Sequence, residues 1–403
     1  MRIRHIVIIF SLLFCWAALY FYAPVGVDIS TLRVIYSILL TITTLLSWQT
    51  LFYKGHNTLY YNPMRWLLFA MLFSIIPAAV TWGQPVSLTL RATLPFLAYI
   101  YFFFLYRYQP EIKDLEKVIW VLCIVYICVY LYSLYMAPTF VFGDVGKDIN
   151  DNRGFFRFSV PGPAFLHLGF FLTIAKYIDQ KKTKWIVFSA LLFLTIILHV
   201  TRQYIFWAFV VSFFFLTVNM KLWKRIVFIV FVAALLVYAF QNVPIFQRLS
   251  QLTEKQYARS QNHREDVRVT SYRLFLFQFS PDVFTTVFGN GAPHVDSSYG
   301  RLVTNLKDKG LYMSDVGYAQ IYALFGIIGL ASFIGICYRV LRQKVPDKYL
   351  YAKMYIIYAM FSTFLTGYFL NVDVNGAILA ISVALYILER VNGQSRTVRI
   401  ITE

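Results

Sequence analysis

Long apolar runs follow one another along nearly the whole chain, with only short polar breaks between most of them. A helix that crosses the hydrocarbon core of a bilayer needs about 20 such residues. Only 14% of the 403 residues are charged and 59% are hydrophobic, whereas soluble domains average about a quarter charged. We therefore predict an all-α polytopic membrane protein with about twelve transmembrane helices, over residues 5–23, 31–52, 65–81, 90–106, 118–137, 159–178, 185–200, 203–219, 224–241, 314–338, 352–371 and 374–390.

The seventh and eighth predicted helices are separated only by Val200, Thr201 and Arg202. A tight hairpin and a single broken helix would both produce this pattern, so the sequence leaves the two open. At the N-terminus, the first apolar run is about eighteen residues long and lacks a small-residue cleavage site, which favours a retained helix over a signal peptide.

Residues 242–313 form the one long polar interval. No repeat or low-complexity linker divides the chain, so we predict a single membrane domain over residues 1–403 with this interval as a large loop. Within the loop, residues 269–279 have the pattern of a short amphipathic helix that ends before Pro281. Residues 288–291, Phe-Gly-Asn-Gly, have the composition of a turn.

The basic residues predict the orientation of the helices. With the N-terminus inside, the predicted cytoplasmic segments hold 22 of the 37 Lys and Arg residues and the short outer segments hold six. Both termini are then cytoplasmic and the large loop lies outside, in the periplasm of a bacterial inner-membrane protein. The formal charge of +18 thus marks one side of a membrane, and we expect no nucleic acid as a partner.

Asp315 stands where the polar interval returns to an apolar run, in Ser-Asp-Val-Gly-Tyr-Ala-Gln. A carboxylate at such a boundary is costly to desolvate unless it has a partner or a chemical task. It is therefore a candidate general base, which would take a proton from an attacking hydroxyl. The simpler alternative is that Asp315, after Ser314, caps the positive end of the following helix.

Four arginines lie on the same predicted side: Arg153, Arg157, Arg202 and Arg273. A guanidinium stays protonated and grips phosphate oxygens with two parallel hydrogen bonds, so this set suits a lipid-linked diphosphate. Arg153 and Arg157 could instead reach lipid headgroups, and Arg273 could belong to the polar face of a surface helix. Arg202 is harder to explain in this way, because it stands between two apolar runs and needs a partner or solvent.

Other chemistries have no pattern to support them. The sequence contains no Gly-rich phosphate loop, no nucleophile elbow and no HExxH zinc motif. Asp144, Asp148 and Asp151 do not have the spacing of a calcium loop. We therefore expect neither a metal nor another cofactor.

Taken together, several motifs resemble those of the O-antigen ligase and polymerase superfamily. Residues 315–330, with Gly326 and Gly329 as GxxG, are similar to its signature, and Thr-Arg-Gln-Tyr at 201–204 is similar to its Ser/Thr-Arg element. The run from Arg273 to the turn at 288–291 resembles an arginine helix followed by a Gly-x-Gly turn. RGFFRFSVPGP, which contains Arg153 and Arg157, resembles an earlier arginine-bearing outer loop, so that the similarity covers about residues 150–335.

One departure bears on the branch of this superfamily. Ligases usually carry His-Asn eleven residues before the first glycine of GxxG, where this chain has Asp315 and Val316. An acidic residue there is more like the Wzy-type polymerases of O-antigen and related surface polysaccharides. The alternatives are the ligase, which transfers finished polysaccharide to lipid A core, and a lipid-linked oligosaccharide flippase or other transporter without chemistry.

The resemblance implies a metal-independent glycosyltransferase of GT-C-like architecture that polymerises undecaprenyl-diphosphate-linked repeat units on the outer face of the inner membrane. Arg202 and Arg273 would hold the diphosphate and stabilise the leaving group, Arg153 and Arg157 would help to bind the second substrate, and Asp315 would activate the acceptor hydroxyl. The implied partners are the lipid-linked glycan, membrane lipid and a chain-length regulator protein.

Overall fold

The computed structural model describes residues 3–18, 29–52, 58–136, 139, 141–142, 160–199, 201–218, 220–242, 247, 267–371 and 376–402. In these ranges the protein is all-helical and contains no strand. The elements are α1 (Ile3–Ala18), α2 (Ile29–Phe52), α3 (Tyr61–Phe73), α4 (Ile75–Val80), α5 (Val86–Thr93), η2 (Phe96–Tyr99), α6 (Ile100–Tyr108), α7 (Ile112–Tyr135), α8 (Pro163–Gln180), α9 (Thr183–Leu198), α10 (Arg202–Thr217), α11 (Leu222–Asn242), α13 (Val267–Arg273), η4 (Leu274–Gln278), α14 (Val283–Phe288), α15 (Ser298–Asp308), η5 (Met313–Asp315), α16 (Gly317–Arg342), η6 (Asp347–Tyr349), α17 (Leu350–Leu365), η7 (Tyr368–Leu370) and α18 (Ala377–Thr402).

Each of the twelve predicted apolar runs coincides with a helix or with a bent pair of helices. By length and composition, four of the described helices can cross a membrane, namely Thr31–Phe52, Tyr61–Val80, Ile112–Tyr135 and Gly317–Arg342. The pair Val86–Thr93 and Phe96–Tyr108, bent by 49°, would make a fifth. The chain is therefore an all-helical protein with several apolar helices of membrane-spanning length.

Some helix boundaries differ from the prediction for identifiable reasons. α7 begins at Ile112 rather than at 118, because its polar first turn includes Asp114, whose negative charge suits a helix N-terminus. α18 continues through polar residues to Thr402, beyond the predicted end at 390. α9 and α10 are two separate helices that contact each other, so the hairpin is the correct one of the two alternatives left open by the sequence.

Prolines lie at the two places where a predicted apolar run is divided between consecutive helices. Pro77 lacks an N–H and its ring would collide with the carbonyl of Phe73, so α3 ends there and α4 begins after Ser74. Pro95 interrupts the next pair in the same way, between α5 and η2. Both interruptions fall near the end of the bundle that carries the large-loop helices.

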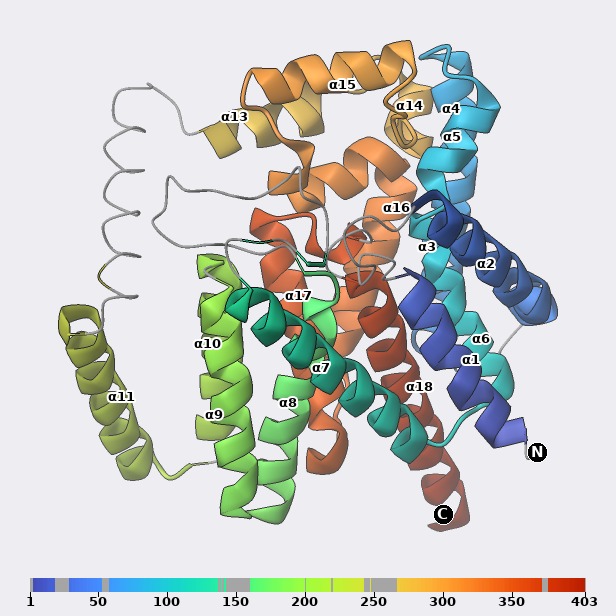
Figure 1. Ribbon diagram of the computed structural model, residues 1–403. Coiled ribbons are helices and arrows are strands. Elements are labelled where there is room, and N and C mark those ends of the chain that lie inside the picture. Colours follow the sequence, from blue (N-terminus) through green and yellow to red (C-terminus); the bar gives the residue numbers. More distant parts are fainter. Residues whose placement is uncertain are drawn as a thin grey trace.

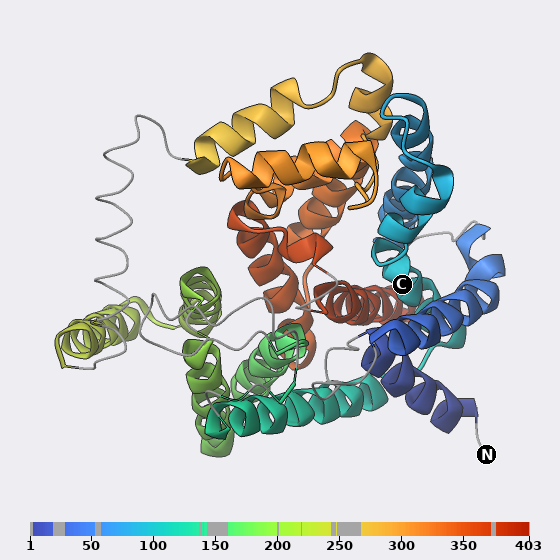
Figure 2. The same ribbon diagram turned by 45° about the horizontal axis from the view of Figure 1, so that its top comes forward.

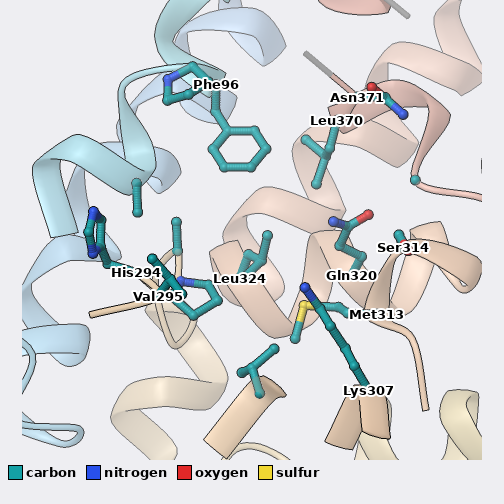
Figure 3. A pocket seen from close by; sticks show the side chains of 16 residues that line it. Phe96, His294, Val295, Lys307, Met313, Ser314, Gln320, Leu324, Leu370 and Asn371 are labelled. Atoms are coloured by element: carbon teal, nitrogen blue, oxygen red, sulfur yellow. The ribbon is translucent and has the colours of Figure 1, made fainter. Parts of the chain in front are cut away.

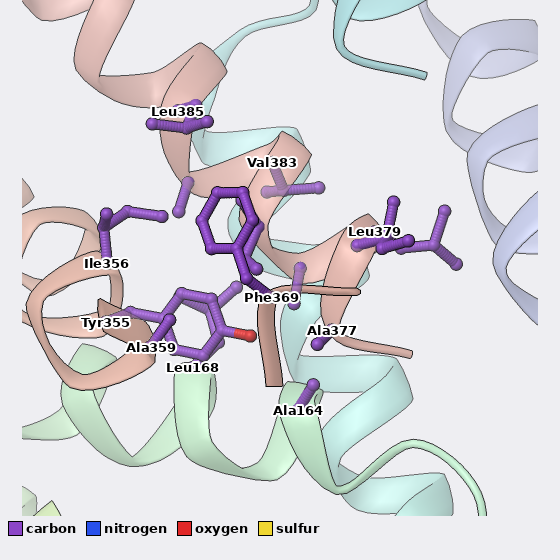
Figure 4. Close-up of a cluster of buried hydrophobic side chains, with 14 of the residues drawn as sticks. Ala164, Leu168, Tyr355, Ile356, Ala359, Phe369, Ala377, Leu379, Val383 and Leu385 are labelled. Atoms are coloured by element: carbon purple, nitrogen blue, oxygen red, sulfur yellow. The ribbon is translucent and has the colours of Figure 1, made fainter. Parts of the chain in front are cut away.

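The centre of the bundle is made by α8, α17 and α18, which are apolar around most of their circumference, as is expected of helices that are buried on all sides. Figure 4 shows side chains from all three helices meeting around Phe369 of η7. Ala164 and Leu168 come from α8, Ile356 and Ala359 from α17. The small alanines allow the helices to approach closely.

Hydrogen bonds tie distant segments together at one end of the bundle. The Glu389 carboxylate of α18 accepts from the backbone N–H groups of Leu59 (3.0 Å) and Tyr60 (2.6 Å), at the start of α3. The Gln343 side chain, just after α16, accepts from the Tyr60 hydroxyl (2.5 Å) and donates to the carbonyl of Leu388 (2.8 Å). The start of α3 and the ends of α16 and α18 therefore lie together.

The helices of the large loop lie at the opposite end. Figures 1 and 2 show α13, α14 and α15 across the top of the bundle beside α4 and α5, while both marked chain ends lie at the bottom of Figure 1. The predicted amphipathic helix over 269–279 corresponds to α13 and the π-helical turn η4 that follows it.

Candidate functional site

Two glycine motifs singled out in the sequence meet in one junction. Gly326 has φ 66° and ψ −169° inside α16, a conformation that is almost restricted to glycine. The carbonyls of Ala323 and Leu324 lie just before this break. They accept from the backbone N–H groups of Asn290 and Gly291, both at 2.9 Å. The Phe-Gly-Asn-Gly turn of the large loop is thus docked onto the first part of α16.

The Asn290 side chain fixes this junction further. It is fully buried, its amide donates to Ser280 Oγ (3.0 Å) and to the carbonyl of Ala323 (2.8 Å), and its oxygen accepts from Trp82 Nε1 (2.9 Å). The Trp82 ring in turn stacks on Tyr299 of α15, with centroids 4.9 Å apart. The segment after α4, the loop helices and α16 therefore form one connected unit.

Gln84 holds the segment that follows the turn. Its side chain is buried and donates to the carbonyl of Ala292 (2.9 Å), while its oxygen accepts from the backbone N–H of His294 (2.9 Å) and from the Ser297 hydroxyl (2.6 Å). All three partners belong to the stretch between α14 and α15. The position of this stretch is therefore set by a buried side-chain amide that lies more than 200 residues earlier in the chain.

Between this stretch and α16 lies a pocket of about 630 Å³, within the range of roughly 300–1,000 Å³ typical of small-molecule sites. Its walls come from the segment around Phe96, from α15, from η5 with the start of α16, and from η7 (Figure 3). Its polar side chains are His294, Lys307, Ser314, Gln320 and Asn371.

Asp315 does not line this pocket, although Met313 and Ser314 of the same turn do. Its side chain is half-buried, and burial raises the pKa of the carboxyl above its usual range. The charge of Arg268 on α13 acts in the opposite direction on this pKa. The pKa of Asp315 is therefore affected by a charge on α13, and its side chain lies beside the pocket rather than inside it.

The alternative role of Asp315 as a helix cap is not what the structure shows. The N-cap residue of α16 is Val316, and no side chain makes a capping hydrogen bond there. The carboxylate is thus held at the helix entrance without serving as its cap.

The predicted arginines are placed differently from one another. Arg273 ends α13 and is exposed, and Arg202 begins α10 and is half-buried. Arg153 and Arg157 lie outside the described residues. On α13 it is Arg268, five residues before Arg273, whose charge reaches Asp315.

A packed turn connects the Arg202 segment with the Asp315 segment. Gly367 donates its backbone N–H to the carbonyl of Ser314, and the next residue, Tyr368, packs edge-on against Tyr204 with ring centroids 5.4 Å apart. Tyr204 lies two residues after Arg202 in the first turn of α10. The Thr-Arg-Gln-Tyr element therefore lies on the far side of the turn that holds Ser314.

Sequence reasoning missed Arg268, Lys307 and Gln320. Arg268 stood one residue outside the predicted loop helix, and Lys307 was one of nine basic residues in the large loop. Gln320 offered a usable signal, because it is a polar residue near the start of a long apolar run, within the motif that contains Asp315.

Among the described residues, no three His, Cys, Asp or Glu side chains come together as metal ligands. Compared with protein-family models the chain matches none, and no curated protein matches it either.

Proposed function

We propose that the protein is a membrane glycosyltransferase that polymerises undecaprenyl-diphosphate-linked oligosaccharide repeat units into O-antigen or a related surface polysaccharide. The observation that supports this function best is the half-buried carboxylate of Asp315, placed beside a pocket of about 630 Å³ under the large-loop helices. A pocket with few polar groups next to a residue with a perturbed pKa is the usual arrangement of an active site.

The proposed topology places all twelve helical units across the inner membrane, in a GT-C-like arrangement with both termini inside. The positions of basic residues support this orientation. Lys176, Arg339 and Arg390 lie in the second halves of α8, α16 and α18, and the C-terminal end of α18 lies at the end of the bundle away from α13, α14 and α15 (Figure 1). The pocket would then open on the periplasmic side, where a lipid-linked glycan is presented.

In the proposed reaction, Asp315 takes the proton from an acceptor hydroxyl. The hydroxyl oxygen bonds to the anomeric carbon of the donor, the bond from that carbon to the phosphate oxygen breaks, and its electron pair leaves with undecaprenyl diphosphate. Burial raises the pKa of Asp315 towards neutral pH and so makes its carboxylate a better base. No nucleotide sugar, metal or other cofactor is used in this scheme.

The arginines supply positive charge in this proposal. Arg202 and Arg273 bind the diphosphate and stabilise the charge that develops on it, the kind of preorganised electrostatic effect that contributes most in many enzymes. Arg153 and Arg157 help to hold the second lipid-linked glycan. Arg268, which the structure adds to this set, keeps Asp315 ionised by its charge.

The test is elongation by purified protein. Wild-type protein in lipid nanodiscs receives a lipid-linked repeat unit without nucleotide sugar, and the glycans are sized by mass spectrometry. We expect longer glycans with wild type and with the control Asp308→Asn, an exposed acid at the end of α15, and their loss with Asp315→Asn.

Three results would contradict the proposal. Elongation that survives Asp315→Asn would remove the base. Transfer only to lipid A core would identify a ligase. Movement of the lipid-linked unit across a vesicle membrane, without new glycosidic bonds, would identify a transporter.

A further inference from the structure

The pocket beside Asp315 has an unusual charge composition. Its lining includes one ammonium group, one imidazole, two side-chain amides, a hydroxyl and a phenyl ring, but no carboxylate. Figure 3 shows Lys307 of α15 extending its amine between Met313 and Gln320. Lys307 is an exposed residue at the rim of the pocket, and among the described residues it has no ion-pair partner.

Gln320 contributes a side-chain amide to the lining of the pocket. Its Oε1 is buried and has no hydrogen-bond partner among the described residues. The backbone of Gly367 makes room for this oxygen, since a Cβ built on Gly367 would lie only 2.1 Å from it. The oxygen is therefore covered by Gly367, and the amide NH2 of Gln320 is the group that faces the pocket (Figure 3), where it can donate to a ligand oxygen.

One wall of the pocket suits the apolar face of a sugar ring. Phe96 is held edge-to-face against Phe325, with centroids 5.5 Å apart, and its half-buried ring lines the pocket together with Pro95. Aromatic walls combined with a few oriented polar groups are typical of small-molecule sites.

From these features we infer that the pocket binds a sugar that carries a carboxylate, of the uronic acid type, within the glycan. Lys307 pairs with the carboxylate, the amide NH2 of Gln320 donates a hydrogen bond to a ring hydroxyl, and Phe96 lies against the ring face. This inference rests on the proposed function, because it names the class of substrate at the same site.

The lining distinguishes a carboxylate from a diphosphate. One lysine provides a single positive point charge, which matches a single carboxylate, whereas a diphosphate carries more charge and is best held by several arginines. Arg202, Arg268 and Arg273 lie on α10 and α13, which contribute no side chain to this pocket. Neutral amides and a ring are suited to sugar hydroxyls.

Binding of small probes tests the inference without any glycosyl transfer. The dissociation constants of methyl β-glucuronide and methyl β-glucoside are measured by ligand-observed NMR on full-length protein in nanodiscs. Lys307→Gln removes the charge, Gln320→Leu removes the amide donor, and Lys309→Gln is the matched control, an exposed lysine of the same loop that does not line the pocket.

We expect wild type and Lys309→Gln to prefer the glucuronide by roughly tenfold, and Lys307→Gln to lose that preference while it keeps its glucoside affinity. Gln320→Leu should weaken both sugars. Equal binding of the two sugars by wild type, or a preference that survives Lys307→Gln, would overturn the inference.

Inorganic pyrophosphate is the competing ligand. If it displaces the glucuronide and its own binding depends on Lys307, the pocket is a diphosphate site and the sugar assignment is wrong. Elongation of a lipid-linked repeat unit is measured in parallel. Selective glucuronide binding without elongation would refute the proposed function alone, and elongation without that selectivity would refute this inference alone.

Discussion

Replacing Gly326 by alanine should undock the large loop from α16. The substitution affects the junction in two ways, because the glycine has a positive φ and because its missing side chain leaves room for the loop backbone. A Cβ at this position would lie 2.2 Å from the carbonyl oxygen of Val287 and 2.5 Å from the backbone nitrogen of Gly289. Both are backbone atoms, which cannot move aside as the end of a flexible side chain can.

The size of the effect follows from these contacts. A non-glycine residue in this region of φ and ψ costs about 1–3 kcal/mol. Separation of the backbones also removes the two hydrogen bonds from Asn290 and Gly291, at about 1 kcal/mol each. The free energy of local opening should therefore fall by about 3–5 kcal/mol, which corresponds to roughly 100- to 4,000-fold faster amide exchange at about 1.4 kcal/mol per tenfold.

Hydrogen exchange read by mass spectrometry on peptides from residues 283–297 measures this change. Gly310→Ala is the matched control, since Gly310 also has positive φ (82°) but a Cβ there meets nothing closer than 3.9 Å. It should leave exchange in residues 283–297 close to wild type. If Gly326→Ala raised exchange there no more than Gly310→Ala, the proposed junction between the turn and α16 would be wrong.

Three further predictions concern the site and its entrance. Burial raises the pKa of Asp315, so the ionised carboxylate lowers the stability of the folded protein at neutral pH. Asp315→Asn should therefore raise the unfolding temperature at neutral pH, and this gain should disappear in acid. A lower unfolding temperature for the variant at neutral pH would contradict the prediction. Arg268 lowers that same pKa, so Arg268→Gln should move the acidic limb of the elongation rate to higher pH, and a limb that stays or moves lower would exclude this pairing. Gly367→Ala should displace the side-chain amide of Gln320 and weaken sugar binding severalfold in NMR titrations, while thermal unfolding changes little. Gly317→Ala should instead prevent folding, because its Cβ would meet two backbone oxygens at 2.1 and 2.3 Å. Equal effects of the two substitutions on thermal unfolding would refute this distinction.

The positions of the helices could be predicted well from the sequence, because apolar runs of membrane-crossing length are a local property. The break of α16 at Gly326 could not, since the helical pattern continues through it and the cause is a turn 36 residues upstream. The Gly-x-Gly and GxxG motifs could both be identified in the sequence. Their contact with each other could not, because it depends on the tertiary structure.

The site was predicted in part. Asp315 stood out as a charge at an apolar boundary, and the structure keeps it half-buried. Its electrostatic partner was expected among other arginines, and Arg268 was overlooked because the helix that carries it begins two residues earlier than predicted. Lys307 could not be distinguished from other loop lysines without knowing which helix face covers the pocket.

The Glu389 carboxylate that accepts from the amides of Leu59 and Tyr60 sets an order for biogenesis. The two partners are about 330 residues apart in the chain. At roughly 5–20 residues per second, the ribosome needs about 16–66 s after making the start of α3 before it makes Glu389. During that time the amides must stay in contact with water, because unpaired amides are not tolerated in lipid. The last helix therefore completes the hydrogen bonding at the start of α3. A chain truncated before Glu389 would be released from the ribosome with these amides unpaired, and it would be open to quality-control proteolysis.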